Sequence, residues 1–269
     1  MLHSLVLVAA LAQDEGEQLK ALVEKKGPSV VTVNVVLTTK AAMGGESGDQ
    51  ESRHSARGIV VDSSGIVMIS SASYSNRLWS RFYKGMGAEF KVTPKDFKVV
   101  VGNEEKERDA WLIATDEKLE LAFVQIDAAG DGLPSPVDLS KSVPLAVGQR
   151  AAVVGRLAKG YDYAPYFRTL RIAGEISKPR NGWIVDGSVS EIGMPVYTIS
   201  GDLAGVVAAM PVPADGSEGE AGILEMVFKS MGLGGAEPTF VLPADAVKSR
   251  LDLARKQAKE MREKKKDGK

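Results

Sequence analysis

This sequence contains no cysteine and only two histidines, His3 and His54, and both shortages exclude particular kinds of site. Without cysteine the chain has no disulfide, no thiol nucleophile and no Cys-ligated zinc. A zinc site built from histidine needs several imidazoles, which two residues cannot supply. We therefore expect a protein that works without a metal ion or other cofactor.

The chain also lacks a strong excess of charge of either sign, because its formal net charge is −1 over 269 residues. A chain with so little net charge has no overall field that would attract nucleic acid or an anionic membrane. Only the segment 244–269 is clearly basic. We expect no nucleic-acid partner.

The first twelve residues form a short apolar segment that ends in Ala10-Leu11-Ala12. An apolar run followed by small residues is typical of a cleaved signal peptide, although no Lys or Arg precedes the run here. The alternative is an apolar segment that packs on the fold. Cleavage before Gln13 would export the protein to the periplasm or the medium. No other stretch approaches the ~20 apolar residues that span a bilayer, so we expect no membrane-spanning segment after processing.

Most of the remaining chain is predicted to form short strands, because runs rich in Val and Ile alternate with turn residues. Helices are expected only at residues 15–26 and 244–266, the second docked at its start and solvated at its end. Segments 39–57, 76–94 and 211–238 are interpreted as loops. The expected strands cover residues 29–37, a hairpin within 58–70, and 97–101, 110–114, 121–126, 150–154, 168–176, 182–185, 194–199 and 203–210. Such spacing favours an all-β fold of barrels or a sandwich.

Seven degenerate motifs follow one another along the chain: GPSVV from Gly27, GIVVDSSGIVMISSA from Gly58, LELAFVQI from Leu119, LAVGQRAAVVG from Leu145, TLRIAGEIS from Thr169, SEIGMPV from Ser190 with GDLAG from Gly201, and FVLP from Phe240. In this order they resemble the HtrA/DegP family of trypsin-like serine proteases. The resemblance covers about residues 27 to 250. It implies an all-β chain of two antiparallel β-barrels of trypsin/chymotrypsin type, with a short N-terminal helix and a C-terminal helix.

The resemblance also divides the chain into segments. It implies an N-terminal helix and first barrel at 13–140 and a second barrel at 141–243, preceded by the signal peptide expected at 1–12 and followed by the basic helical tail expected at 244–269. The tail is too short for the PDZ domain that usually follows the barrels in this family.

The residues at the implied catalytic positions cannot perform the chemistry of the family. The general-base position falls on Ala72, the carboxylate position on Glu120 and the nucleophile position on Ile192. A methyl group accepts no proton and an alkyl group attacks no carbonyl, so the triad is lost. Ala72 and Ile192 are instead expected to meet as a buried apolar plug between the barrels.

The loop around the nucleophile position departs from the family pattern as well. Its oxyanion-loop positions hold Ser190, Gly193 and Met194, of which only the glycine is kept. Side chains in so tight a loop disturb the oxyanion geometry. A shifted alignment would bring Ser188 or Ser190 to the nucleophile position, and His54 would then be the one base left in a mature chain.

These observations favour a catalytically inactive homologue that binds a protein or peptide, or regulates an active relative. The resemblance places peptide contacts on an edge strand at Ala208, Ala209 and Met210, where an extended peptide can add to the sheet. One alternative is an atypical active serine endopeptidase. Another is a structural or assembly protein that does not use the cleft. The sequence names no partner and leaves a homo-oligomer open.

Overall fold

The computed structural model describes residues 15–43, 46–71, 89–104, 106–127, 132–178, 180–187, 189–209 and 239–267. Several expectations from the sequence lie outside these residues: the signal peptide at 1–12, the loop at 211–238, and Ala72, Ser188 and Met210. Within the described part of the chain, no helix is both long and apolar enough to cross a bilayer.

The chain folds into two closed antiparallel barrels of six strands each, which is the fold class predicted from the sequence. The first barrel closes in the order β1-β2-β3-β6-β5-β4. Its strands are β1 (Val30–Met43), β2 (Glu46–Asp62), β3 (Ile66–Ser70), β4 (Glu89–Val100), β5 (Arg108–Asp116) and β6 (Leu121–Ile126).

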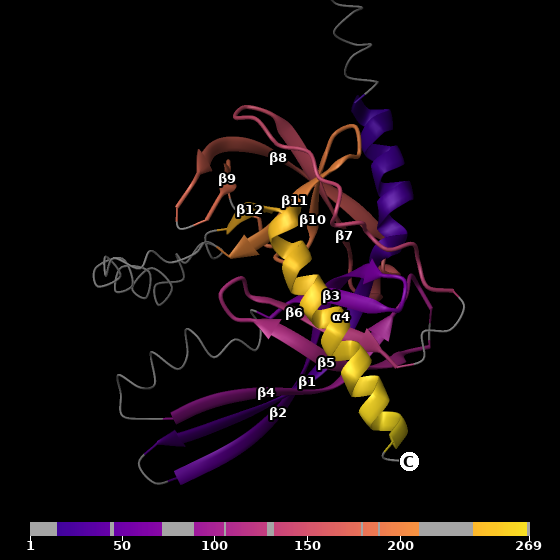
Figure 1. Ribbon diagram of the computed structural model, residues 1–269, viewed down its shortest axis with the longest axis vertical. Helices are drawn as coiled ribbons and strands as arrows, with labels where there is room; N and C mark the ends of the chain where they lie inside the picture. Colours follow the sequence, from indigo (N-terminus) through magenta and orange to yellow (C-terminus); the bar gives the residue numbers. More distant parts are fainter. Residues whose placement is uncertain are drawn as a thin grey trace, which may run out of the picture.

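The second barrel closes in the order β10-β11-β12-β9-β8-β7. Its strands are β7 (Arg150–Arg156), β8 (Pro165–Ile176), β9 (Gly182–Val185), β10 (Pro195–Thr198), β11 (Leu203–Ala209) and β12 (Thr239–Pro243). A helix at residues 15–26 and the short 3-10 helix η1 (Gly27–Ser29) precede β1, η3 (Lys159–Tyr161) joins β7 to β8, and α4 (Ala244–Asp267) follows β12. Figure 1 shows α4 running across both barrels.

Residues 39–43, 46–57 and 89–94 are in strands, so the prediction of loops there was wrong. β1 and β2 pair continuously from Val30↔Ile59 to Met43↔Glu46, and Figure 1 shows this hairpin and β4 extending well beyond the first barrel. Residues 49–57 of β2 are mostly exposed on both faces. A strand that is polar on both faces lacks the alternation of apolar and polar residues by which strands are predicted. Cross-strand pairs such as Lys40–Asp49 (3.1 Å) support it instead.

One apolar cluster runs without a break through both barrels and α4. It contains Met68 and Phe123 of the first barrel, Tyr197 and Phe240 of the second, and Leu251 of the helix. A second cluster fills the interior of the first barrel alone, around Val33 and Val60. Because the first cluster is shared, the two barrels bury apolar surface against each other as well as within themselves.

A buried arginine of β7 joins the start of the chain to the second barrel. The Arg156 guanidinium donates to the carbonyls of Val30 (2.9 Å), Gly27 (2.8 Å) and Tyr163 (2.7 Å). Its own carbonyl accepts a hydrogen bond from Arg57 Nε of β2 at 2.8 Å. Burial lowers the pKa of Arg156. Three carbonyl oxygens take the place of water around this charge, so the cation holds η1, β1 and the β7–β8 loop together.

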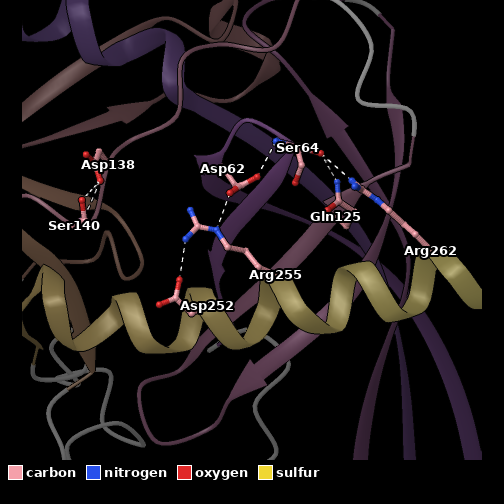
Figure 2. Close-up of polar contacts among 8 residues, drawn as sticks. All are labelled: Asp62, Ser64, Gln125, Asp138, Ser140, Asp252, Arg255 and Arg262. Carbon is pink, nitrogen blue, oxygen red and sulfur yellow. Dashed lines mark hydrogen bonds and ion pairs between the residues drawn. The ribbon is translucent and has the colours of Figure 1, made fainter.

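Helix α4 packs on the barrels through one apolar stripe, as its sequence predicted. Its buried residues are Ala244, Val247, Leu251, Ala254 and Ala258. Its polar side also makes contacts with the first barrel, shown in Figure 2 for Arg255 with Asp62 (2.8 Å) and for Arg262 with the carbonyl of Ser64 (3.0 Å). Arg250 pairs with Asp116 at 2.7 Å. The second half of α4 is therefore attached to the first barrel up to Arg262. The expectation that this end of the helix is solvated was wrong for the residues up to Arg262.

The contact between Arg255 and Asp62 makes part of the stability depend on pH. Burial by itself would raise the pKa of Asp62, but hydrogen bonds from Ser64 and Arg255 outweigh it and hold the pKa below its usual value. A depressed pKa means that the stabilisation is present above the unfolded value of about 3.9 and is lost as pH falls through the folded value.

Asp62→Asn should therefore lower the free energy of unfolding by about 1 kcal/mol at neutral pH and flatten its decline on the acid side. Urea denaturation at a series of pH values measures both effects. Asp252→Asn is the matched control, because Asp252 contacts the same arginine from within α4 (2.9 Å) and leaves the contact with the barrel intact. Equal curves for wild type and Asp62→Asn would show that the contact contributes nothing.

Candidate functional site

The carboxylate position of the resemblance lies at the start of β6, close to the end of β3. Glu120 is buried, with 4% of its surface exposed, and has a left-handed backbone with φ of 52°. Its carbonyl accepts a hydrogen bond from the amide of Ser71 at 2.7 Å. Ser71 directly precedes Ala72, the residue at the general-base position. The hydrogen bond from Ser71 therefore connects the chain just before the general-base position to Glu120 at the carboxylate position.

The nucleophile position lies in a tight turn before β10. The amide of Met194 donates to the carbonyl of Glu191 at 3.0 Å, which makes Ile192 and Gly193 the two central residues of a β-turn. Gly193 has φ of 88°, as the third residue of a type II turn requires. The glycine kept from the family pattern is therefore the residue that this turn needs.

The same turn packs directly on the first barrel. A Cβ added at Gly193 would lie 3.0 Å from the backbone nitrogen of Ser70 and 3.2 Å from the carbonyl carbon of Ile69. Both atoms belong to β3, whose last residues lead to Ser71. The structure thus brings the turn of Ile192 and the neighbourhood of Glu120 to the same end of β3, at the junction between the barrels.

Two amides in the oxyanion-loop positions are already used within the chain. Gly193 N donates to Val207 O (2.8 Å), and Met194 N donates to Glu191 O as described above. An oxyanion hole needs donors directed at the charge that develops on the substrate. The hydroxyl of Ser190, an exposed residue, donates to Glu191 Oε2 at 3.3 Å. None of these contacts leaves a donor set that resembles a working oxyanion hole.

Ile192 is only partly buried, although it packs against the shared apolar cluster. The expectation that it is fully buried was therefore wrong. Its place in a turn explains this, because the central residues of a β-turn project from the surface that the turn closes. The expected apolar partner, Ala72, lies outside the described residues, so the plug stays a prediction.

A buried carboxylate next to the nucleophile position was not foreseen from the sequence. The side chain of Glu191 is 1% exposed and lies 3.4 Å from Arg168 Nε of β8. It also accepts a hydrogen bond from the hydroxyl of Tyr166 at 3.1 Å. Burial raises the pKa of Tyr166, so its phenol stays protonated and can donate. These contacts anchor the turn to β8.

The Glu191 cluster had only a weak signal in the sequence. Tyr166 lies opposite Gly155 in the pairing of β8 with β7, and its ring occupies the space that a side chain at 155 would need, since a Cβ added there would lie 2.5 Å from the ring. A glycine within a predicted strand indicates a close neighbour. That neighbour could not be named without the register.

His54 lies on the part of β2 that extends beyond β3, opposite Val35. Its ring contacts the hydroxyl of Ser52 at 3.1 Å and is exposed. This places the imidazole on the projecting hairpin, and no hydrogen bond among the described residues joins it to Ser190 or Glu120. Within the same residues, no three His, Asp or Glu side chains are grouped to hold a metal ion.

The strand proposed to bind peptide is buried along its length, but next to the turn it has a side, called here its open side, on which no described strand pairs with it. β11 pairs with β12 from Gly205↔Pro243 to Ala209↔Thr239, and with β10 only as far as Val206↔Pro195. On the side of β11 that faces β10, the next hydrogen bond goes from the amide of Val207 to the carbonyl of Met194 (2.9 Å). Amide and carbonyl groups of alternate residues point to the same side of a strand, so those of Ala209 face the side past the turn. No described strand pairs with Ala209 there.

A hollow of about 520 Å³ lies elsewhere between the barrels, lined by residues that include Pro28, Val101, Leu133, Arg156 and Pro165. None of the catalytic-position residues lines it. We place the candidate site at the turn and β11, because the nucleophile and peptide-contact positions that the resemblance implies lie there.

Gly193→Ala tests the contact between the turn and β3. Alanine at a positive φ costs about 1 kcal/mol, and the added Cβ meets backbone atoms that cannot move cheaply. Gly201→Ala is the matched control, since Gly201 has φ of 92° and its Cβ would meet only Leu22 Cδ1 at 3.7 Å. In urea denaturation, Gly193→Ala should be less stable than Gly201→Ala by about 1–2 kcal/mol. Equal losses would place the turn away from the first barrel.

Ile192→Ala should destabilise the protein by about 1–2 kcal/mol, less than the ~2–5 kcal/mol of a fully buried isoleucine. The midpoint of thermal unfolding should then fall by a few degrees. Ile199→Ala is a suitable comparison, because Ile199 is also partly buried against the same cluster. A loss of stability as large as that of a core truncation would show that Ile192 is covered.

Comparison with known proteins does not assign this geometry to a family. Neither the family models nor the curated proteins that were searched gave a match to the chain. The functional argument therefore depends on the two barrels, the turn at Ile192 and Gly193, and the open side of β11.

Proposed function

We propose that this chain is an HtrA/DegP-like protein of the trypsin fold that has lost proteolytic activity and binds an extended protein or peptide segment. The observation that carries the proposal is the turn at the nucleophile position, in which an alkyl side chain stands where acyl transfer needs a hydroxyl. Two neighbouring amides are engaged within the chain. Loss of nucleophile and base together removes several orders of magnitude in rate.

Binding is supported by the open side of β11 beside this turn. A peptide that adds to Ala209 would form backbone hydrogen bonds and extend the second barrel as an extra antiparallel strand. Strand addition needs no nucleophile, so the loss of catalysis leaves it intact. Export to the periplasm or the medium, through cleavage before Gln13, is the compartment that we propose.

An assay with fluorescein-labelled casein, an unfolded polypeptide, separates binding from cleavage. We expect fluorescence anisotropy to rise on mixing while gels show no fragments, and a fluorophosphonate probe to leave the protein unlabelled. Ala209→Pro removes the amide that faces the open side without removing a bond to β12, and it should weaken binding at least about tenfold. Ala209→Ser keeps the amide and is the control.

The outcomes distinguish the competing functions. Stoichiometric labelling of Ser190 or Ser188 would establish an active serine endopeptidase and overturn the proposal. Absence of both binding and labelling would favour a structural or assembly role that does not use the cleft. Binding that survives Ala209→Pro would place the peptide elsewhere on the molecule.

A further inference from the structure

The projecting part of β2 has one edge without a strand partner in the described chain. β2 pairs with β1 from Glu46 to Ile59, but with β3 only from Gly58 to Asp62. Residues 49–57 therefore present their second row of amides and carbonyls away from the sheet. Figure 1 shows this part of the hairpin extending past the first barrel, away from the second. An exposed edge of this kind pairs readily with another strand.

The charges along this edge change sign in order. Asp49, Glu51 and Arg53 are alternate residues, so their side chains lie on one face of the strand. Asp49 pairs with Lys40 of β1, and Glu51 pairs with Lys95 of β4. Arg53 is exposed and has no ion pair with any described residue. The edge is thus acidic toward its tip and basic toward the barrel.

We propose that this edge pairs with the same edge of a second copy of the chain, antiparallel and about a twofold axis at Ser52. Ser52 then lies opposite itself, and Glu51 lies opposite Arg53 of the partner subunit. By symmetry, Arg53 also lies opposite Glu51 of the partner subunit. Asp49 lies diagonally across from Arg53 of the partner subunit. The two hairpins and their β4 strands form one continuous sheet, with the barrels at its opposite ends.

The order of charges selects this register. Opposite residues of an antiparallel pair lie on the same face of the sheet. The twofold axis must therefore pass through a residue that faces its own copy, and moving the axis to the neighbouring residue shifts the pairing by two residues. One step in either direction would place Glu51 opposite itself or Arg53 opposite itself. Either arrangement puts like charges in direct contact, which destabilises the pair.

Charges on edge strands also serve to prevent pairing in many proteins. Charges that prevent pairing are all of one sign along the edge, so the edge repels the same edge of every other copy. An edge that changes from acidic to basic attracts its own antiparallel copy instead. The inference does not depend on the cleft or on peptide binding.

The oligomeric state of the purified chain tests the proposal by sedimentation velocity over a range of protein concentrations. Wild type should form dimers that weaken as salt is added, because the paired charges are exposed and screened. Arg53→Glu makes the facing charges all negative, and Glu51→Arg makes them all positive. Each should raise the dimer dissociation constant at least about tenfold. Lys141→Glu, at an exposed site (87%) outside the hairpin, makes the same change in net charge as Arg53→Glu and should leave the dimer unchanged.

Mixing the two charge variants gives the decisive measurement. Arg53→Glu and Glu51→Arg present complementary edges to each other, so an equal mixture should form a heterodimer with an affinity near that of wild type. Circular dichroism shows that each variant is folded. A wild type that stays monomeric at high micromolar concentration overturns the proposal. So does a variant that dimerises like wild type, or a mixture that stays monomeric.

Discussion

The two barrels are held in one arrangement by a buried cation. The Arg156 guanidinium contacts three backbone carbonyls, two of them at the start of the first barrel and one in the β7–β8 loop. A guanidinium charge in the interior is costly unless oxygen atoms surround it. If these segments shifted apart while Arg156 stayed buried, the guanidinium would lose its carbonyl partners. The position of β1 relative to β7 follows from this requirement.

The same constraint reaches the candidate site through a short series of contacts. Arg57 donates to the carbonyl of Arg156 and lies over the ring of Tyr166, 5.7 Å from its centroid. Tyr166 in turn donates to Glu191, which begins the turn of Ile192 and Gly193. A trypsin-like cleft depends on loops from both barrels meeting in one geometry. Here the contacts that join the barrels around the turn use residues outside the positions of the implied triad.

Two further features extend the fold beyond the two barrels. Helix α4 spans both barrels and is fixed to the first through Arg250, Arg255 and Arg262. The hairpin of β1 and β2 projects from the first barrel with an open edge. The helix stabilises the arrangement of the barrels, and the hairpin offers a surface that is separate from the cleft. Binding at β11 and pairing at β2 can therefore occur on the same molecule.

The sequence alone determined the fold class, because the strand spacing and the order of motifs both indicate barrels. It also determined the apolar stripe of α4, since the stripe depends only on residue identity and period, and it placed an alkyl side chain at Ile192, where the resemblance implies a nucleophile. The tertiary structure decided what depends on neighbours distant in the chain. The burial of Glu191 requires Tyr166 and Arg168, and the strands within 39–57 require each other, because a polar hairpin has no apolar pattern of its own. Cross-strand register supplies these neighbours, and local sequence does not specify it.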